Sequence, residues 1–280
     1  MLVQAESLTS TSVGLIMKRK IITLAAMAGL FAGNANAALT NFDITIQFNG
    51  GLTASQQTIF SDAETFWEDT LVSYAEEIFF PPGLTIEASG ENIDGAGGIL
   101  GQAGPSYGYQ GTDFFYASAG IMRFDSADLS AMESNGTLYS VIVHEMAHVI
   151  GFGSLWGSEY NDLYAGNGQY VGAYAVAAYR EEFDPSATYV PVELDGGAGT
   201  ADAHWDETWA GPQSELMTGY IEGATTLSNT TLASFKDLGY TTTLASVSEP
   251  ETGGNVADVP APLIGALSVF GLALIGRRRK

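Results

Sequence analysis

The feature that most restricts this chain is an uninterrupted apolar segment, Leu138 to Ile150, that contains two of the protein's 3 histidines. Its apolar residues recur at helical spacing with no glycine or proline before Gly151, so the pattern predicts one helix. His144 and His148 lie four residues apart, which places their side chains about 40° apart on one helix face. Both imidazoles can therefore point at one metal ion, and Glu145 projects beside them.

The short pattern HExxH also occurs by chance, and the competing interpretation is a helix with two surface histidines and a solvated glutamate. The histidine content decides between the two, because the third histidine, His204, is the only other imidazole. In the longer zinc motif HExxHxxGxxH the third histidine follows closely, but that position is Ser154 here. His204 stands far downstream, before Met217, and we predict that it completes a metal site.

Three segments together carry a resemblance to a known family. The sequences HEMAHVIGFGSLW, AHW and SELMTG resemble the leishmanolysin family of metzincin peptidases, in which an insertion separates the third zinc histidine from the first two. Flanking segments, Ala119 to Leu129 and Leu227 to Tyr240, are similar to bacterial members, and the likeness runs from Phe42 to Tyr240. The resemblance implies an α+β fold for residues 38–240.

In that fold, an N-terminal lobe with a twisted sheet and the zinc helix spans about residues 38–155. An insertion follows at about 156–200, and a small C-terminal lobe at about 201–240. The resemblance also implies three zinc ligands, a general base, a methionine turn and a helix-terminating turn: His144, His148 and His204; Glu145; Met217; and Gly151. It implies a zinc metalloendopeptidase in which Glu145 activates a zinc-bound water to hydrolyse peptide bonds of protein or peptide substrates. Residues 119–124 are the expected strand for binding an extended substrate.

Two other interpretations stay open. A non-catalytic surface or matrix adhesion protein could retain this fold, although an intact Glu145 counts against it. A peptidase of the gluzincin type would use Glu159 or another downstream acid as third ligand, and the methionine segment counts against that. Calcium is a further candidate ion in so acidic a chain, but no loop has ligand spacing that identifies a site.

Charge and cysteine content exclude several classes of function. The chain has 10 basic and 32 acidic residues, a formal net charge of −22, and 0 cysteines. Such an acidic protein has no electrostatic attraction to a phosphate backbone, so nucleic-acid binding is excluded as its main role. The absence of cysteine excludes disulfides, thiol catalysis and a cysteine that blocks the zinc.

The N-terminal segment has the composition of an export signal. Residues 1–37 predict a signal peptide, with a basic cluster at 17–20, an apolar run at 21–32 and a small-x-small cleavage site before Ala38. Met17 is the candidate true start of this signal. A bacterial signal peptidase would then be one partner of the chain.

The C-terminal segment predicts a second processing signal. Residues 241–258 are polar and indicate a linker, and residues 259–280 combine Val-Pro-Ala-Pro, an apolar run and a basic end. This pattern resembles the PEP-CTERM class of bacterial sorting signals in its Val-Pro-x-Pro variant. The resemblance implies an exported protein at the cell surface or outside it, a transient anchor in the inner membrane, and a dedicated sorting protease. The alternative is a plain membrane anchor.

The remaining patterns predict the start of the domain. Alternating apolar residues indicate a strand at 41–48, and Thr53 with Gln56 forms a capping box before a helix that ends near Leu71. A second strand is expected at 84–88 and a glycine-rich loop at 94–105. Thr137 is the expected N-cap of the helix that carries the histidines.

Overall fold

The fold is that of a computed structural model, which describes residues 41–78, 83–221, 225–243 and 273–276. The described residues belong to one compact unit, Ala37–Lys280. The predicted signal peptide, most of the linker and most of the sorting signal lie outside the described residues. Among those residues, no helix is long and apolar enough to cross a membrane.

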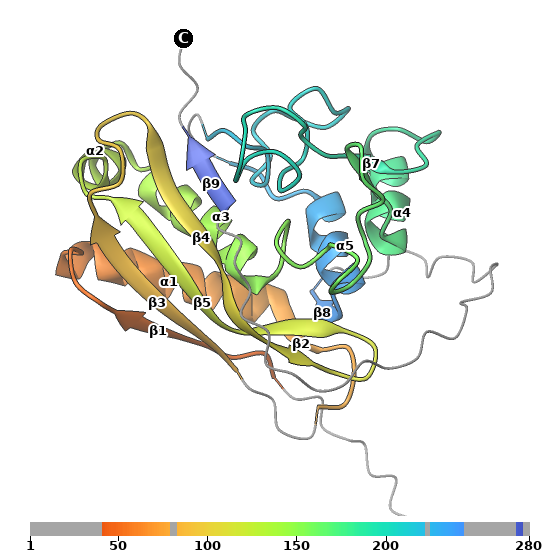
Figure 1. The fold of residues 1–280 in the computed structure, drawn as a ribbon, viewed down its shortest axis with the longest axis horizontal. Coiled ribbons are helices and arrows are strands. Elements are labelled where there is room, and N and C mark those ends of the chain that lie inside the picture. Colours follow the sequence, from red (N-terminus) through yellow and green to blue (C-terminus); the bar gives the residue numbers. More distant parts are fainter. Residues whose placement is uncertain (1–40, 79–82, 222–224, 244–272, 277–280) are drawn as a thin grey trace, which may run out of the picture. The chain divides into compact units, whose positions relative to one another are not determined.

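A five-stranded mixed sheet forms one layer of the fold (Figure 1). The three strands β1, β3 and β5 run parallel, and β4 and β9 continue the sheet in antiparallel pairs. In spatial order the strands are β1 (Ile44–Phe48), β3 (Leu84–Glu91), β5 (Phe115–Asp125), β4 (Ile99–Gln110) and β9 (Ala273–Gly276). The two strands predicted at 41–48 and 84–88 are thus confirmed. Strand β1 begins three residues later than predicted, and β3 ends three residues later than predicted.

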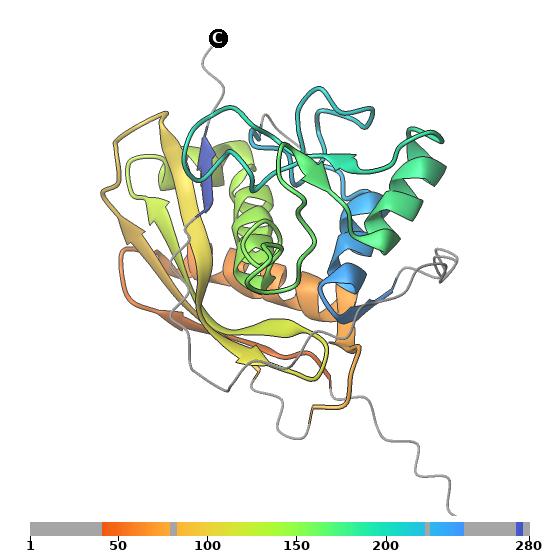
Figure 2. The same ribbon diagram turned by 45° about the vertical axis from the view of Figure 1, so that its right-hand side comes forward.

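Two helices, α1 (Ala54–Thr70) and α3 (Leu138–Ile150), cover one face of this sheet (Figure 2). The predicted capping box starts α1, with the Thr53 and Gln56 side chains each bonded to the other's backbone N–H. Trp67 on α1 is fully buried, and its Nε1 donates to the Val143 carbonyl at 3.0 Å. This bond and the surrounding apolar core fix α1 against α3.

The short helix α2 (Leu129–Asn135) leads into α3, whose bounds agree with the predicted helix. Thr137 is the N-cap residue of α3, as predicted, but its side chain makes no capping hydrogen bond. The Thr137 hydroxyl instead donates to Asn135 Oδ1 at 2.7 Å in the turn between the helices. Apart from Tyr139 and Ser140, every residue of α3 is buried, so the helix lies at the centre of the fold.

The glycine-rich segment predicted as a loop is only partly one. Residues 94–98 form turns, but Ile99–Gln110 is strand β4. The glycines in these strands allow a close approach of the helix to the sheet, rather than giving the chain flexibility. A Cβ at Gly101 would lie 2.9 Å from Glu145 Oε1, and one at Gly120 on β5 would overlap Val149. Small residues on β4 and β5 therefore let α3 lie directly on the sheet.

The strand expected to bind an extended substrate lies inside the sheet, not at its edge. Residues 119–124 lie within β5, which pairs with β3 on one side and β4 on the other, so its backbone has no free edge. The next strand on one side is β4, and residues 273–276 of β9, the outer strand here, pair along its other edge.

The C-terminal part adds small elements beside the main sheet (Figure 1). The predicted insertion contains β6, α4 and β7, and α5 packs against α4. Strand β8 pairs with β2 and so joins the end of the domain to the end of α1. The bounds are β2 Leu71–Tyr74, β6 Gln169–Tyr170, α4 Ala173–Glu182, β7 Val190–Pro191, α5 Asn229–Asp237 and β8 Tyr240–Thr242. The mixture of helix and sheet agrees with an α+β fold.

Candidate metal centre

Two of the candidate ligands come from the buried helix α3. His144 and His148 are one turn apart on it, and both are fully buried. Helix α3 ends at Gly151, whose φ of 143° favours glycine. The N–H groups of Gly151 and Phe152 both donate to the Ala147 carbonyl at 3.0 Å, which closes the last turn. Helix α3 therefore ends at a position whose backbone conformation suits glycine.

The third candidate ligand reaches α3 on an irregular segment. His204 is fully buried and lies in a stretch of turns between β7 and α5. Gly153 makes this approach possible, because it has a φ of 72° and a Cβ there would overlap the Ala203 carbonyl. The chain after the helix and the chain before His204 thus run in contact. Sequence reasoning did not identify Gly153.

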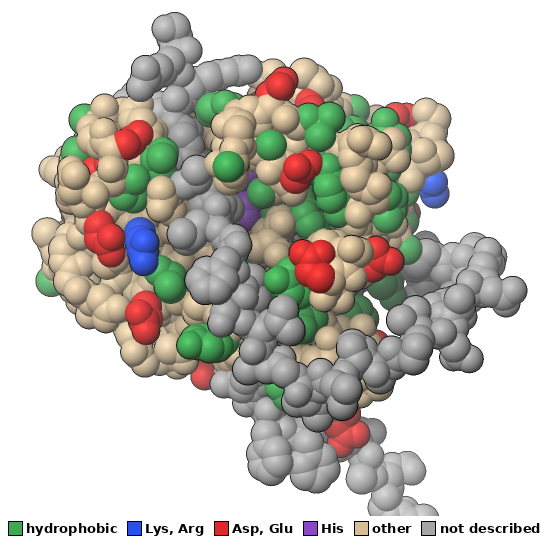
Figure 3. Space-filling model, viewed as in Figure 1, with side chains coloured by type: hydrophobic (Ala, Val, Ile, Leu, Met, Phe, Trp, Pro, Cys, Tyr) green, Lys and Arg blue, Asp and Glu red, His purple; other side chains and the backbone are tan. Residues whose placement is uncertain are grey.

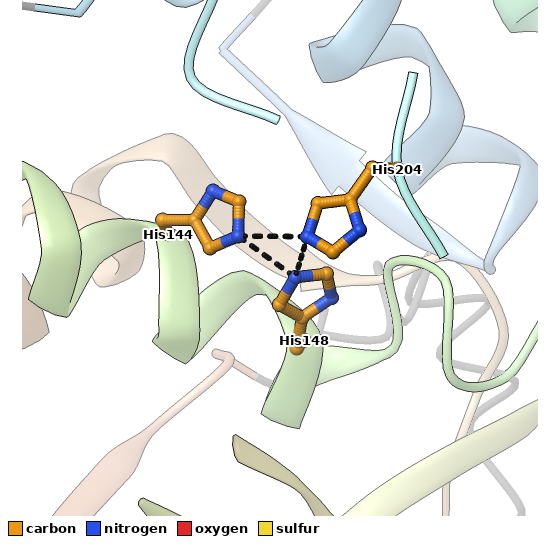
Figure 4. Close-up of side chains that lie close together, drawn as sticks. All are labelled: His144, His148 and His204. Carbon is orange, nitrogen blue, oxygen red and sulfur yellow. Dashed lines mark hydrogen bonds between the residues drawn. The ribbon is translucent and has the colours of Figure 1, made fainter. Parts of the chain in front are cut away.

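The three imidazoles meet at their Nε2 atoms (Figure 4). The distance from His148 Nε2 to His144 Nε2 is 2.9 Å, and to His204 Nε2 it is 3.0 Å. The distance from His144 Nε2 to His204 Nε2 is 3.1 Å. These three residues form a group able to hold a metal ion, whereas the alternative ligand Glu159 is exposed and is not part of it.

The outer nitrogen of each ring identifies the tautomer. His144 Nδ1 donates to the Leu216 carbonyl at 2.6 Å, His148 Nδ1 to Phe152 at 2.9 Å and His204 Nδ1 to Thr200 at 2.9 Å. Because carbonyls only accept, each Nδ1 carries the proton and each Nε2 presents a lone pair to the other two. Three buried lone pairs facing one another repel unless a cation lies between them.

This donor set fits zinc. Three imidazoles bonded at about 2.0–2.1 Å in a tetrahedral site have their nitrogens about 3.3–3.4 Å apart, slightly more than the spacing here. Each ring also has the outer hydrogen bond that metal-binding histidines use to fix their orientation. All three predicted ligands, His144, His148 and His204, meet these two requirements of spacing and outer hydrogen bonding.

Burial sets the electrostatics of the histidines. Loss of solvation lowers the pKa of His144 and His148 well below the usual value, and the neighbouring imidazole of His204 lowers both pKa values further. The same burial lowers the pKa of His204 to about 4. All three rings are therefore neutral at pH 7, which is the state that binds a metal ion.

Glu145 follows His144 on α3 and is fully buried. Neither of its carboxylate oxygens has a hydrogen-bond partner within the described part of the chain. Burial alone raises the pKa of this carboxyl well above its usual value. A buried, unpartnered carboxyl group next to a metal-binding cluster is suited to accept a proton from a water molecule.

The segment from Glu215 to Thr218 forms a tight turn against the segment that carries His204. Met217 is fully buried, and its carbonyl accepts the Trp205 N–H at 3.0 Å. Trp205 is also fully buried and donates from Nε1 to Thr231 Oγ1 at 2.8 Å, which agrees with a structural role.

Figure 3 shows the molecular surface from the same side as Figure 1. A histidine side chain is visible there between other side chains, and acidic groups are much more frequent than basic groups on this surface.

The comparisons with known proteins cover this part of the chain. Residues 115–251 match the family model described as leishmanolysin, peptidase family M8, which is a shorter range than the likeness from residue 42 to 240 suggested. A leishmanolysin homologue of Crithidia fasciculata is 31% identical over 138 residues. That match covers 44% of this chain and 20% of the relative, so the chain spans about a fifth of the length of that protein. The chain is therefore similar to leishmanolysin over the region that contains all three histidines, and this similarity supports a metallopeptidase.

Proposed function

We propose that this protein is a zinc-dependent endopeptidase of the leishmanolysin type. The observation that carries the proposal is the meeting of three neutral, buried imidazole Nε2 atoms within 2.9–3.1 Å of one another. Glu145, on the same helix as two of them, adds a buried carboxyl group with no partner among the described residues. The similarity of residues 115–251 to leishmanolysin points to the same chemistry.

In this proposal, His144, His148 and His204 would hold the ion through their Nε2 atoms. Bound zinc would supply Lewis acidity, which makes water more acidic and polarises a peptide carbonyl. Glu145 takes the proton from the attacking water and delivers it to the leaving amine. Met217 would form the floor of the site, and Gly151 turns the chain toward the third ligand.

The substrate would bind as an extended strand along β4. Gly101 on this strand lies next to Glu145, because a Cβ there would be 2.9 Å from the carboxylate. A peptide hydrogen-bonded to the outer edge of β4 therefore passes beside the proposed base. The backbone of β9 pairs with residues 99–103 of this edge, so a substrate and β9 would compete for it.

The proposal includes export. The basic and apolar pattern at 17–37 and the pattern at 259–280 favour a protein that is processed by a signal peptidase and a sorting protease. The zinc site would then act on proteins at or outside the cell surface. Mass spectrometry of the exported protein should find Ala38 as its first residue and no residues after the Val-Pro-Ala-Pro segment.

Metal analysis combined with a protease assay tests the proposed activity. The purified full chain should contain one zinc per protein and hydrolyse an unfolded protein such as casein. A chelator should remove both the zinc and the activity, and added zinc should restore them. A chain that binds zinc but cleaves no unfolded protein would instead support the adhesion interpretation.

A further inference from the structure

Glu215 is a buried acid that the proposed chemistry does not use. Its side chain is 1% exposed, and it lies two residues before Met217 in the turn that contacts the His204 segment. Burial raises the pKa of this carboxyl, whereas its hydrogen bonds to Thr231, Met217 and Ser228 act in the opposite direction. A charged group in such a position is costly unless every oxygen is bonded.

All the hydrogen bonds of the Glu215 carboxylate are accepted from donors. Oε1 accepts from the Ser228 N–H at 3.1 Å, Ser228 Oγ at 3.0 Å and Thr231 Oγ1 at 2.6 Å. Oε2 accepts the Met217 N–H at 2.5 Å. Ser228 is the N-cap of α5, so the carboxylate ties the turn to the first residues of a helix.

The bond to Met217 reaches the metal centre through a single peptide group. The N–H of Met217 and the carbonyl of Leu216 belong to the same planar peptide unit and point in opposite directions. That Leu216 carbonyl accepts Nδ1–H of His144 at 2.6 Å. Fixing the N–H therefore fixes the direction of the carbonyl that orients the His144 ring. A carboxylate on the N–H also polarises the peptide and strengthens its carbonyl as an acceptor.

The corresponding peptide group behind His204 has a different partner. The Thr200 carbonyl accepts from His204 Nδ1, and the N–H of the same peptide, that of Ala201, donates to the Gly197 backbone carbonyl at 2.9 Å. That partner is neutral, whereas the partner behind His144 is a carboxylate. Of these two histidines, only His144 is linked to a carboxylate through the peptide group that accepts its Nδ1–H.

We propose that Glu215 is a positioning residue of the metal centre, which acts on His144 through the Leu216–Met217 peptide group. The inference rests on the proposed function only in taking His144 as a ligand. Outer hydrogen-bond partners of this kind typically contribute about 10–100-fold to metal affinity. Glu215 touches neither the substrate path nor the imidazole itself.

The test is the state of each imidazole in the metal-free full chain, measured by ¹⁵N–¹H NMR of protein labelled at histidine. The chain's 3 histidines give few resonances to assign. In the wild type, all three rings should be Nδ1–H tautomers at neutral pH. In Glu215→Gln, the amide cannot accept from both sides, so His144 should lose Nδ1–H population and exchange that proton faster, while His148 and His204 stay unchanged.

Asp237→Asn is the matched control. Asp237 is another buried acid and lies at the end of α5. It accepts from the backbone N–H groups of Tyr174 and Ala175, each at 2.9 Å. This substitution should lower stability without changing the His144 signal. Equal changes at all three histidines, the same changes in Asp237→Asn, or no change in Glu215→Gln would each overturn the proposal. If Glu215→Gln does not fold, Ser228→Ala removes only one donor to Oε1 and should give a smaller change at His144 alone.

A second readout uses zinc itself. Competition with a chromophoric chelator should show zinc affinity about 10–100-fold weaker in Glu215→Gln and near the wild-type value in Asp237→Asn. Equal affinities in Glu215→Gln and wild type would contradict the positioning role. A wild type that binds no zinc would refute the proposed function instead, and the metal-free NMR comparison would still test the link from Glu215 to His144.

Discussion

The two sides of the candidate metal centre are built in different ways. On one side, His144 and His148 sit on α3, a regular helix buried on nearly all sides. On the other, His204 and Met217 lie in turns between β7 and α5, held by side-chain hydrogen bonds and close backbone contacts. The helix side needs only the helical period to bring its ligands together. The turn side depends on several separate contacts, and the loss of any one changes the position of a ligand.

The largest effect should come from removing one ligand on each side. His204→Ala and His148→Ala each leave two imidazoles, and zinc affinity should fall by more than the about 10–100-fold that outer-shell changes cause. Activity should fall to background in both. Zinc content by elemental analysis and circular dichroism, which checks folding, measure the outcome. Stoichiometric zinc and full activity in His204→Ala would show that the helix side is sufficient.

A smaller but still large effect is expected from the proposed base. Glu145→Gln keeps the size of the side chain and removes its ability to take a proton, so activity should fall by about 10²–10⁴-fold. Zinc content should hardly change, because the three imidazoles remain. Steady-state kinetics and metal analysis of the same preparation check both parts. Near-normal turnover would mean that another group activates the water.

Substitutions at two glycines should affect the two sides of the site separately, with smaller effects on activity and zinc binding than the loss of a ligand or of the base. Gly101→Ala places a methyl group 2.9 Å from Glu145 Oε1 and should lower activity while zinc stays bound. Gly153→Ala, at a φ of 72° and against the Ala203 backbone, should weaken zinc binding through His204. Each should cost about 1–3 kcal/mol of stability by overpacking.

Gly166→Ala is the control for this pair, because Gly166 has a φ of 83° but no atom within 4 Å of an added Cβ. It should lower the melting temperature by backbone strain alone and leave zinc affinity and activity near the wild-type values. If Gly153→Ala behaves like Gly166→Ala, the close approach of the two segments has no role in placing His204.

The smallest effect concerns pH and belongs to the turn side. Burial and the neighbouring carboxyl of Glu193 raise the pKa of Glu207 to about 8 from 4.5. The folded state therefore keeps a proton that the unfolded state releases, so this contribution to stability is complete below pH about 4.5 and is lost as pH rises through about 8. Glu207→Gln should flatten the fall in melting temperature between pH 5 and about 9. Parallel curves for the two proteins would contradict the raised pKa of Glu207.

The same contrast explains how much of the molecule the sequence predicts. The bounds of α3, the capping box of α1 and the strands β1 and β3 follow from local periodicity and end signals, and the structure agrees with them. Strand β4 was not predicted, because its glycines resemble a loop until the helix that they accommodate is in place. Thr137 was correctly placed as the N-cap of α3, but its side chain makes no capping hydrogen bond and its hydroxyl donates to Asn135.

The turn side of the site could be predicted only as residues, not as contacts. The number of histidines and the family resemblance identify His204, but neither indicates that Gly153 admits its segment or that Glu215 fixes the peptide behind His144. Those contacts join residues up to 72 positions apart, and no local pattern encodes them. Long-range hydrogen bonds of this kind become visible only in the folded chain.

We infer that both sides supply ligands to one zinc ion. X-ray absorption at the zinc edge, measured on the zinc-loaded full chain, counts these ligands directly. Three imidazole nitrogens at about 2.0–2.1 Å with one further light atom are predicted for the wild type, and two imidazoles for any zinc that remains in His204→Ala. Two imidazoles in the wild type, or an unchanged spectrum in His204→Ala, would contradict it.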